Sequence, residues 1–279
     1  MIRKSIPLLI AAGLVSPLLT AATPIKIADA DIPNADPKVL VNHITKLEGT
    51  VPAQWRVIWT GDASTEATIS WSTAEEGSKH QVLYVSGENS KQLKTQECQS
   101  NGAYSVGEKN QPVYYHHARL TGLKPDTIYR FIMESDGERS RQLYFKTAPA
   151  SGTDFSFIHG GDSRSGHTAR CRVNLRIAAI AKNDPKVIAF AHGGDYINSG
   201  KDWKQWRLWL SQHELTTAED GRVLPIIPTW GNHDSGILYF EVFDLDKPTE
   251  RWHTTHLGKD VAIVTLDTNS PAAEQAEWL

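Results

Sequence analysis

The strongest constraint on the fold of this chain is a pattern repeated in its second half, where an apolar run ends in glycine followed by an acidic or amide residue. The three motifs are His159-Gly160-Gly161-Asp162-Ser163-Arg164, His192-Gly193-Gly194-Asp195-Tyr196-Ile197-Asn198 and Gly231-Asn232-His233-Asp234. Residues 155–158, 187–191 and 223–230 precede them and are apolar, as is typical of buried strands. Glycine at each strand end permits a sharp exit of the chain.

Two segments with helical periodicity lie between these three strands, at 168–182 and 202–215. Apolar residues recur at helical spacing in both: Val173, Ile177 and Ile180 in the first, and Trp203, Trp206 and Leu210 in the second. Asn183-Asp184-Pro185 is expected to stop the first helix. Trp209 is expected outside the apolar face of the second helix. The spacing of the tryptophans suits packing on the sheet better than an aromatic surface for binding a ligand. The order strand, helix, strand, helix, strand predicts a parallel sheet with right-handed crossovers.

The motifs predict a site at one edge of this sheet. Ligands bind outside the carboxyl ends of parallel strands, so Asp162, Asp195 and Asn232 are expected to meet there. Two carboxylates and an amide oxygen would repel unless a positive group lay between them, and a divalent or trivalent metal suits such hard oxygen ligands. One Gly-Asp after a strand is ordinary turn chemistry, but three such motifs at consecutive strands favour a shared metal site.

Three nearby histidines leave alternatives open. His159 and His192 each precede an aspartate by three residues, and they either orient the carboxylates from outside the metal shell or cap buried strands. His167 follows the first motif and could reach the site.

With these motifs the chain resembles the calcineurin-like metallophosphoesterase superfamily, and within it the purple acid phosphatase-like branch. The resemblance implies that Asp162 ligates a first metal, that Asp195 bridges two metals and that Asn232 ligates the second. It places His233 beside the phosphate as a leaving-group acid or transition-state donor. The implied cofactors are two divalent or trivalent ions, iron, manganese or zinc, and a metal-bound hydroxide would attack phosphorus.

Two positions depart from the family pattern. Arg164 stands where the family usually has histidine or glycine, and we expect its guanidinium to hold a phosphate oxygen. Asn198 occupies the place of the metal-binding tyrosine of purple acid phosphatases, so it enters the candidate metal ligands in that residue's place. Tyr196 is expected to point the other way if strand geometry persists, so a ferric-tyrosinate centre is not expected.

After Gly231-Asn232-His233-Asp234, where the family has its Val-x-x-His and Gly-His-x-His motifs, no histidine of this sequence stands in either pattern. We therefore expect 153–279 to be the N-terminal part of a metallophosphoesterase domain, an incomplete two-sheet sandwich. Residues 261–267 are expected to form a strand of its second sheet, followed by a helix near Pro271. Apolar sheet surface should be exposed, and the isolated chain should tend to aggregate.

The preceding segment, 54–147, has the alternation of a β-sandwich. Ala67, Ile69 and Trp71 alternate with polar residues, which predicts one apolar and one polar face. Residues 117–131 resemble a strand-turn-strand of fibronectin type III, and the same layout precedes the catalytic domain in purple acid phosphatases. The fold class expected for the whole is thus a fibronectin III-like sandwich followed by an α/β metallophosphoesterase domain. His116 and His117 are expected to be structural.

The N-terminus resembles a secretory signal at 1–22, with a positive start and an apolar run, followed by a leader segment at 23–53. The run is too short for a comfortable membrane span, so we expect a secreted or periplasmic protein without a stable membrane partner. A net charge of −3 argues against nucleic-acid binding. Cys98 and Cys171 are expected to be isolated thiols, and nothing here indicates the oligomeric state.

Together these features predict an exported metal-dependent phosphoester hydrolase, acid phosphatase-like, acting on small phosphomonoesters or nucleotides. The alternative is a non-catalytic surface or binding protein with a vestigial metal domain, which the changes at Arg164 and Asn198 favour. A nucleic-acid exonuclease of the same superfamily is weakened by the export signal and the acidic balance.

Overall fold

The computed structural model describes residues 32, 36, 46–87, 92–105, 111–245 and 251–279. The expected signal peptide, 1–22, and most of the leader lie outside the described residues. Within the described part of the chain, no helix combines the length and apolar character needed to cross a bilayer.

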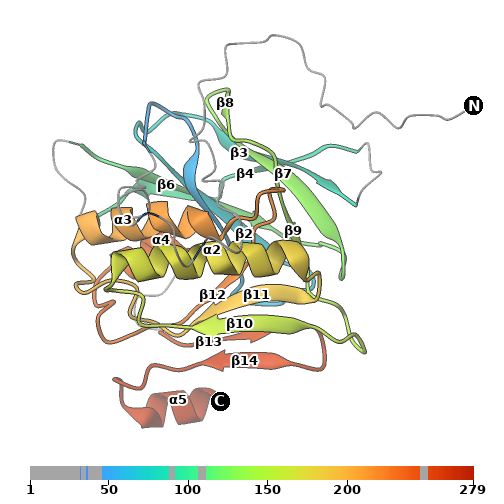
Figure 1. The fold of residues 1–279 in the computed structure, drawn as a ribbon, viewed down its shortest axis with the longest axis vertical. Helices are drawn as coiled ribbons and strands as arrows, with labels where there is room; N and C mark the ends of the chain where they lie inside the picture. Colours follow the sequence, from blue (N-terminus) through green and yellow to red (C-terminus); the bar gives the residue numbers. More distant parts are fainter. Residues whose placement is uncertain (1–31, 33–35, 37–45, 88–91, 106–110, 246–250) are drawn as a thin grey trace, which may run out of the picture.

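The first nine strands form a β-sandwich, in the upper part of Figure 1. They are β1 (Ala53–Ile58), β2 (Ala67–Thr73), β3 (His80–Ser86), β4 (Lys94–Glu97), β5 (Ser100–Ala103), β6 (Tyr114–Leu120), β7 (Ile128–Ser135), β8 (Glu138–Arg139) and β9 (Leu143–Lys146). β1, β2, β6 and β5 belong to one sheet, and β4, β3, β7 and β8 form the other, with β9 paired to β7. The pairings are antiparallel, as alternating sequences joined by short turns favour.

The second half alternates strands and helices as predicted. Its elements are β10 (Ser156–Gly160), α2 (His167–Asn183), β11 (Val187–His192), α3 (Trp203–His213), the 3-10 helix η2 (Glu214–Thr216), β12 (Ile226–Pro228), α4 (Leu238–Phe243), β13 (His253–His256), β14 (Ala262–Thr265) and α5 (Ala272–Trp278). Asp202 caps α3 by accepting hydrogen bonds from the backbone N–H groups of Lys204 and Gln205. The sandwich followed by an α/β domain confirms the predicted fold class.

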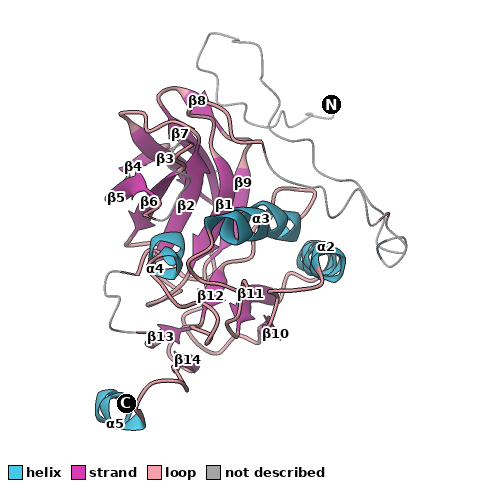
Figure 2. Ribbon diagram, turned by 90° about the vertical axis from the view of Figure 1, so that its left-hand side faces the viewer, coloured by secondary structure: helices cyan, strands magenta, loops and turns pink. Residues whose placement is uncertain are grey.

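A single seven-stranded sheet connects the two halves, in the order β10-β11-β12-β1-β2-β6-β5. β10, β11 and β12 are parallel, with Ile158 opposite Phe190 and Phe190 opposite Ile226. β12 also pairs in parallel with β1, where Ile58 lies opposite Ile226. The sandwich and the predicted catalytic strands therefore share backbone hydrogen bonds rather than a flexible link (Figure 2).

Each face of this sheet has its own hydrophobic core. On one face, Trp71 and Phe131 of the sandwich belong to the same cluster as Ile188 of β11. On the other face, Tyr196 packs with Trp206 and the other aromatic residues of α3 and α4. Because both cores join residues from the two halves, burying them fixes the position of the strand ends at which the candidate site lies.

The polar face expected on β2 is not exposed, which corrects the prediction. Ser70 and Ser72 are fully buried, and Ser70 Oγ lies 2.6 Å from Nδ1 of His117. α4 covers this face, and Nε of the buried Arg56 donates to the carbonyl of Val242 at 2.7 Å. Alternation reports which residues share a face, but it cannot reveal that a later helix will cover the polar one.

Two details of the predicted helices also differ. Val173 was expected on the packed stripe of α2, but it is 56% exposed. Trp209 was expected off the stripe of α3, yet it is buried. α3 is enclosed between the sheet, α2 and α4, so it buries more than the single stripe that a surface helix needs.

The paired histidines of the sandwich behave as expected. His116 and His117 are both buried, and His116 stacks on His80 with ring centroids 3.7 Å apart, so their role is structural. Cys98 and Cys171 are free thiols.

β13 and β14 form a separate antiparallel hairpin, in line with a second sheet. Apolar side chains are exposed on the sheet edge and near the C-terminal end: Phe157 of β10, Val264 of β14, Leu266 and Trp278. Exposed apolar sheet surface is thus present, and aggregation remains a prediction.

Candidate active site

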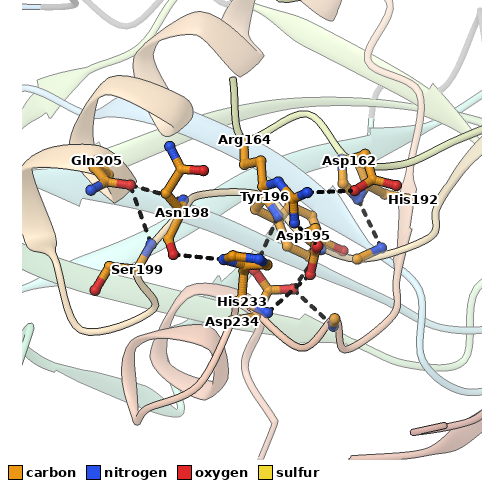
Figure 3. Close-up of polar contacts among 12 residues, drawn as sticks. Asp162, Arg164, His192, Asp195, Tyr196, Asn198, Ser199, Gln205, His233 and Asp234 are labelled. Atoms are coloured by element: carbon orange, nitrogen blue, oxygen red, sulfur yellow. Dashed lines mark hydrogen bonds and ion pairs between the residues drawn. The ribbon is translucent and has the colours of Figure 1, made fainter. Parts of the chain in front are cut away.

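The ends of β10, β11 and β12 bring the three motifs together at one edge of the sheet (Figure 3). The backbone N–H of Gly193 donates to the carbonyl of Gly160 at 2.7 Å, and that of Asp162 donates to the carbonyl of Gly194 at 3.0 Å. These bonds continue the β10–β11 pairing into the turns. They place Asp162 beside the turn that carries Asp195, as the spacing of the motifs predicts.

Glycine is required where the second and third motifs touch. Gly194 has φ of +92°, and a Cβ there would lie 2.7 Å from Cα of Gly231. A Cβ at Gly231 would overlap the backbone nitrogen and Oδ1 of Asp195. Asp162 and Asp195 themselves have φ of +52° and +57°, in a region that non-glycine residues seldom occupy.

Asp234 fastens the second and third motifs to each other. Its Oδ2 accepts from the backbone N–H groups of Asp195 at 2.8 Å and Gly231 at 2.9 Å, and its Oδ1 accepts from Tyr196 at 3.0 Å. The side chain is fully buried, and burial raises its pKa to about 7 against the opposing effect of these three donors. Sequence reasoning gave Asp234 no role, although it is part of the third motif.

Arg164 occupies the position between the two carboxylates where a positive charge was expected. Its Nη1 donates to Oδ2 of Asp195, and its Nη2 lies 3.6 Å from Oδ1 of Asp162. The side chain of Asp195 is only 9% exposed, whereas that of Asp162 is 77% exposed. The guanidinium is therefore held mainly by the buried partner, and its own side chain remains 30% exposed.

His233 lies beside Asp195 with a defined ring orientation. Its backbone N–H donates to Oδ1 of Asp195 at 3.0 Å, and its Nδ1 lies 2.8 Å from the carbonyl oxygen of Asn198. Because a carbonyl oxygen only accepts, Nδ1 carries the proton. Nε2 is then the nitrogen left for other chemistry.

The two candidate asparagines differ in their placement. Asn198 contributes its main-chain carbonyl to His233, while its side chain lies in an exposed position. Asn232 is exposed between Gly231 and His233, at the same edge. A metal-ligating role for either asparagine remains a prediction.

Neither His159 nor His192 makes a hydrogen bond to a site carboxylate. Nδ1 of His192 accepts from the N–H of Gly194 at 3.2 Å, so Nε2 carries the proton and donates to Oγ of Ser163 at 2.8 Å. Burial lowers the pKa of His192 to about 3, in keeping with a neutral ring. His192 thus positions the loop of the first motif, and His159 contacts the Ala191 carbonyl at 3.2 Å.

Tyr196 and His167 also lie near the motifs, and whether His167 reaches the site stays a prediction. Tyr196 points away from the strand edge, as predicted, and its ring stacks on His192 with centroids 3.9 Å apart. Its hydroxyl accepts from the N–H of Thr229 at 3.2 Å, and burial raises its pKa well above the usual value. His167 is the first residue of α2, where burial and the neighbouring Arg170 lower its pKa.

The donors at this edge suit a hard metal ion in kind, because carboxylate and amide oxygens are its usual ligands. In the described part of the chain, however, no group of three or more His, Cys, Asp or Glu side chains is arranged to hold one. That Asp162, Asp195 and Asn232 ligate metal ions therefore stays a prediction, and these three residues would supply only part of a metal shell. In this structure the positive charge between the two carboxylates comes from Arg164.

Family models match both halves of the chain. Residues 52–147 match the purple acid phosphatase N-terminal domain, and residues 155–270 match the calcineurin-like phosphoesterase model. An uncharacterised protein from two strains of Mycobacterium tuberculosis is 23% identical over 190 residues, which cover 63% of this chain. The aligned part spans about a third of that relative, 35% of its length.

Two solved structures share the fold. Purple acid phosphatase PPD1 from yellow lupin (Lupinus luteus) seeds superposes with a TM-score of 0.64 at 16% identity, over 82% of this chain and 48% of that one. PhoD superposes with a TM-score of 0.50 at 14% identity, over 80% of this chain and 53% of that one. The chain thus spans about half the length of each.

The family matches cover the sandwich and the site separately, and the structural matches run across both. The strand ends that carry Asp162, Asp195 and His233 all fall inside the second match. Residues 155–270 thus match the calcineurin-like phosphoesterase family, and residues 52–147 in front of them match the purple acid phosphatase N-terminal domain.

Proposed function

We propose that this chain is an exported phosphoester hydrolase that requires metal ions and acts on small phosphomonoesters or nucleotides. The observation that carries the proposal is the meeting of Asp162, Asp195 and His233 at one sheet edge within a phosphoesterase domain. Export is inferred from the apolar run that follows Arg3 and Lys4. Neither a nucleic acid nor a membrane is proposed as a partner.

Asp162, Asp195 and Asn232 would hold the metal ions, which in this family form a dimetal centre. When bound, such ions neutralise phosphate charge and activate water as a nucleophile. The chain's own contribution is to fix the carboxylates: Asp195 accepts from the His233 N–H and is backed by Asp234 through its own N–H. Groups preorganised in this way need little rearrangement during a reaction.

His233 is proposed as the proton or hydrogen-bond donor to the leaving oxygen. With Nδ1–H engaged by the Asn198 carbonyl, Nε2 can donate only when the ring carries a second proton. His233→Gln should keep binding but lose turnover.

Arg164 is proposed to turn from Asp195 towards a phosphate oxygen when substrate binds. A guanidinium forks well onto phosphate, and a side chain that is 30% exposed has room to turn. Arg164→Ala should therefore raise the Michaelis constant. An unchanged Michaelis constant would remove this role.

The deciding experiment measures metal content and p-nitrophenyl phosphate hydrolysis on the purified chain, beside Asp195→Asn. We expect about two metal ions per chain, as two-metal sites require, and activity that disappears in the variant. A purified chain that contains no bound metal and does not hydrolyse p-nitrophenyl phosphate would overturn the proposal.

A second candidate is a non-catalytic binding protein. One observation favours it: Arg164 already neutralises Asp195 and Asp162, and the described residues hold no group of three or more metal-ligating acidic, His or Cys side chains. This candidate predicts that Asp195→Asn changes neither metal content nor ligand binding.

A further inference from the structure

A cavity of about 230 Å³ opens beside Asp162, between the β10–β11 edge of the sheet and α2. Its walls are largely apolar, formed by Ile158, Ile177, Phe190 and Trp209. Arg170 from the first turns of α2 also lines it. A charged residue in an apolar wall needs a partner, so the contacts of Arg170 decide what the cavity can hold.

Arg170 is only 6% exposed, and its hydrogen bonds all go to neutral groups. Nε donates to Oε1 of Gln212 at 2.7 Å, and Nη1 donates to the carbonyl of Ser163 at 2.8 Å. Nη2 is buried and has no hydrogen-bond partner. The partners of the guanidinium are an amide oxygen and a main-chain carbonyl, with no carboxylate of the described residues among them, and burial lowers its pKa to about 10. The charge is thus buried without an opposite charge beside it.

The start of α2 adds to the positive character of this end of the cavity. This helix of 17 residues has no side-chain cap, and its first turn contains no acidic residue. Its free backbone N–H groups therefore favour an anion nearby. The only acidic residue lining the described cavity is Asp162, whose side chain is 77% exposed and faces Arg164. A buried guanidinium without a carboxylate points to an anion that the chain itself does not provide.

We propose that this cavity binds a carboxylate or phosphate group carried on a small apolar body, with the anion at Arg170. This inference rests on the proposed function: the cavity would receive the leaving group of a phosphoester whose phosphate lies at Asp162 and Asp195. The volume limits the ligand: about 230 Å³ is below the roughly 300–1,000 Å³ typical of sites for drug-sized molecules. A phenyl-sized anion fits this limit better than a nucleoside or a peptide.

The test is calorimetric titration of the purified chain, in buffer stripped of metal ions, with benzoate, phenylphosphonate and benzyl alcohol. We expect both anions to bind and the neutral alcohol to bind at least tenfold more weakly. The tighter anion identifies the source, carboxylate or phosphate. Arg170→Gln should weaken the anions at least tenfold, and Arg170→Lys should lose less.

Two further variants test the proposal even if Arg170→Gln fails to fold. Val173→Trp changes a cavity-lining residue that is 56% exposed, so it should narrow the cavity and weaken both anions without disturbing the core. Arg176→Gln removes the same charge from an exposed position of α2 outside the cavity lining and should change nothing. Equal affinity for benzyl alcohol and benzoate, or anion binding unaffected by both Arg170→Gln and Val173→Trp, would overturn the proposal.

This outcome is separate from that of hydrolysis. The titration involves neither metal ions nor turnover. If the chain binds benzoate through Arg170 but hydrolyses no phosphoester, the cavity proposal stands and the proposed phosphatase function is wrong. If the chain is an active hydrolase but binds none of the probes at millimolar concentration, only the cavity proposal is wrong.

Discussion

Nη1 of Arg164 donates a hydrogen bond to Oδ2 of Asp195, and this contact joins the loop after β10 to the strand end of β11. The guanidinium therefore lies where a metal ion would approach the carboxylate. Metal and arginine should compete for Asp195, because both need the same oxygen.

The competition predicts that Arg164→Gln raises affinity for Mn²⁺. A partly exposed ion pair is worth up to about 1 kcal/mol, so the gain should be about fivefold. Calorimetric titration of Mn²⁺ measures it, with Arg176→Gln as a charge-matched control. Weaker binding in Arg164→Gln would show that the pair helps to form the metal site instead, and unchanged binding would show that metal and arginine do not compete.

Asp234→Asn should lower stability without changing side-chain size. Three backbone N–H groups point at the two carboxylate oxygens, and an amide nitrogen in place of one oxygen leaves a buried donor facing another donor. The expected loss is about 1–3 kcal/mol in the free energy of unfolding, measured with urea.

The matched control for that change is Asp202→Asn at the start of α3. Asparagine caps helices as well as aspartate does, so stability should change little. Equal losses in the two variants would mean that Asp234 is not a special fastening point.

Gly231→Ala should disrupt the site because the new methyl group overlaps Asp195. Overpacking of this kind costs about 1–3 kcal/mol, and moving Asp195 should also weaken metal binding. Gly160→Ala is the control, since its methyl would meet only the Phe190 ring at an ordinary 3.8 Å. Thermal melts and Mn²⁺ titration compare the two, and normal binding by Gly231→Ala would refute the close packing.

The buried histidines predict loss of stability in acid. Burial, aided by the neighbouring His80, lowers the pKa of His116 from the usual 6.5 to about 3. Between these values the unfolded chain binds a proton that the folded chain does not, so stability falls as pH drops from about 6.5 to about 3. Each such group contributes up to about 1.4 kcal/mol per pH unit.

His116→Gln should flatten this dependence. Urea unfolding at pH 7, 6 and 5 gives the slope, and the comparison concerns slopes because the variant also changes the contact with Thr73. A slope equal to that of the parent chain would mean that His116 is charged in the folded protein.

Much of the site followed from local pattern. Apolar runs, glycine turns and helical spacing located β10, α2, β11 and α3, and the rule for parallel strands brought Asp162 and Asp195 to one edge. These predictions succeeded because strand direction and turn chemistry depend on residues close in sequence.

Other features depended on contacts between distant segments. The pairing of β1 with β12, the burial of Ser70 beneath α4 and the enclosure of Trp209 each join segments far apart in the chain. A periodic pattern marks a face of an element but does not identify what covers it.

The sequence by itself determined the order of strands and helices, the turns at their ends and the identity of the acidic residues that meet there. Only the tertiary structure decided that Arg164 lies between those acids, that Asp234 ties their turns together and that Arg170 is buried without an acidic partner. The reason is physical: local spacing sets the direction of the backbone, whereas the partner of a charged side chain is set by which distant groups the packed sheet and helices bring within a few ångströms.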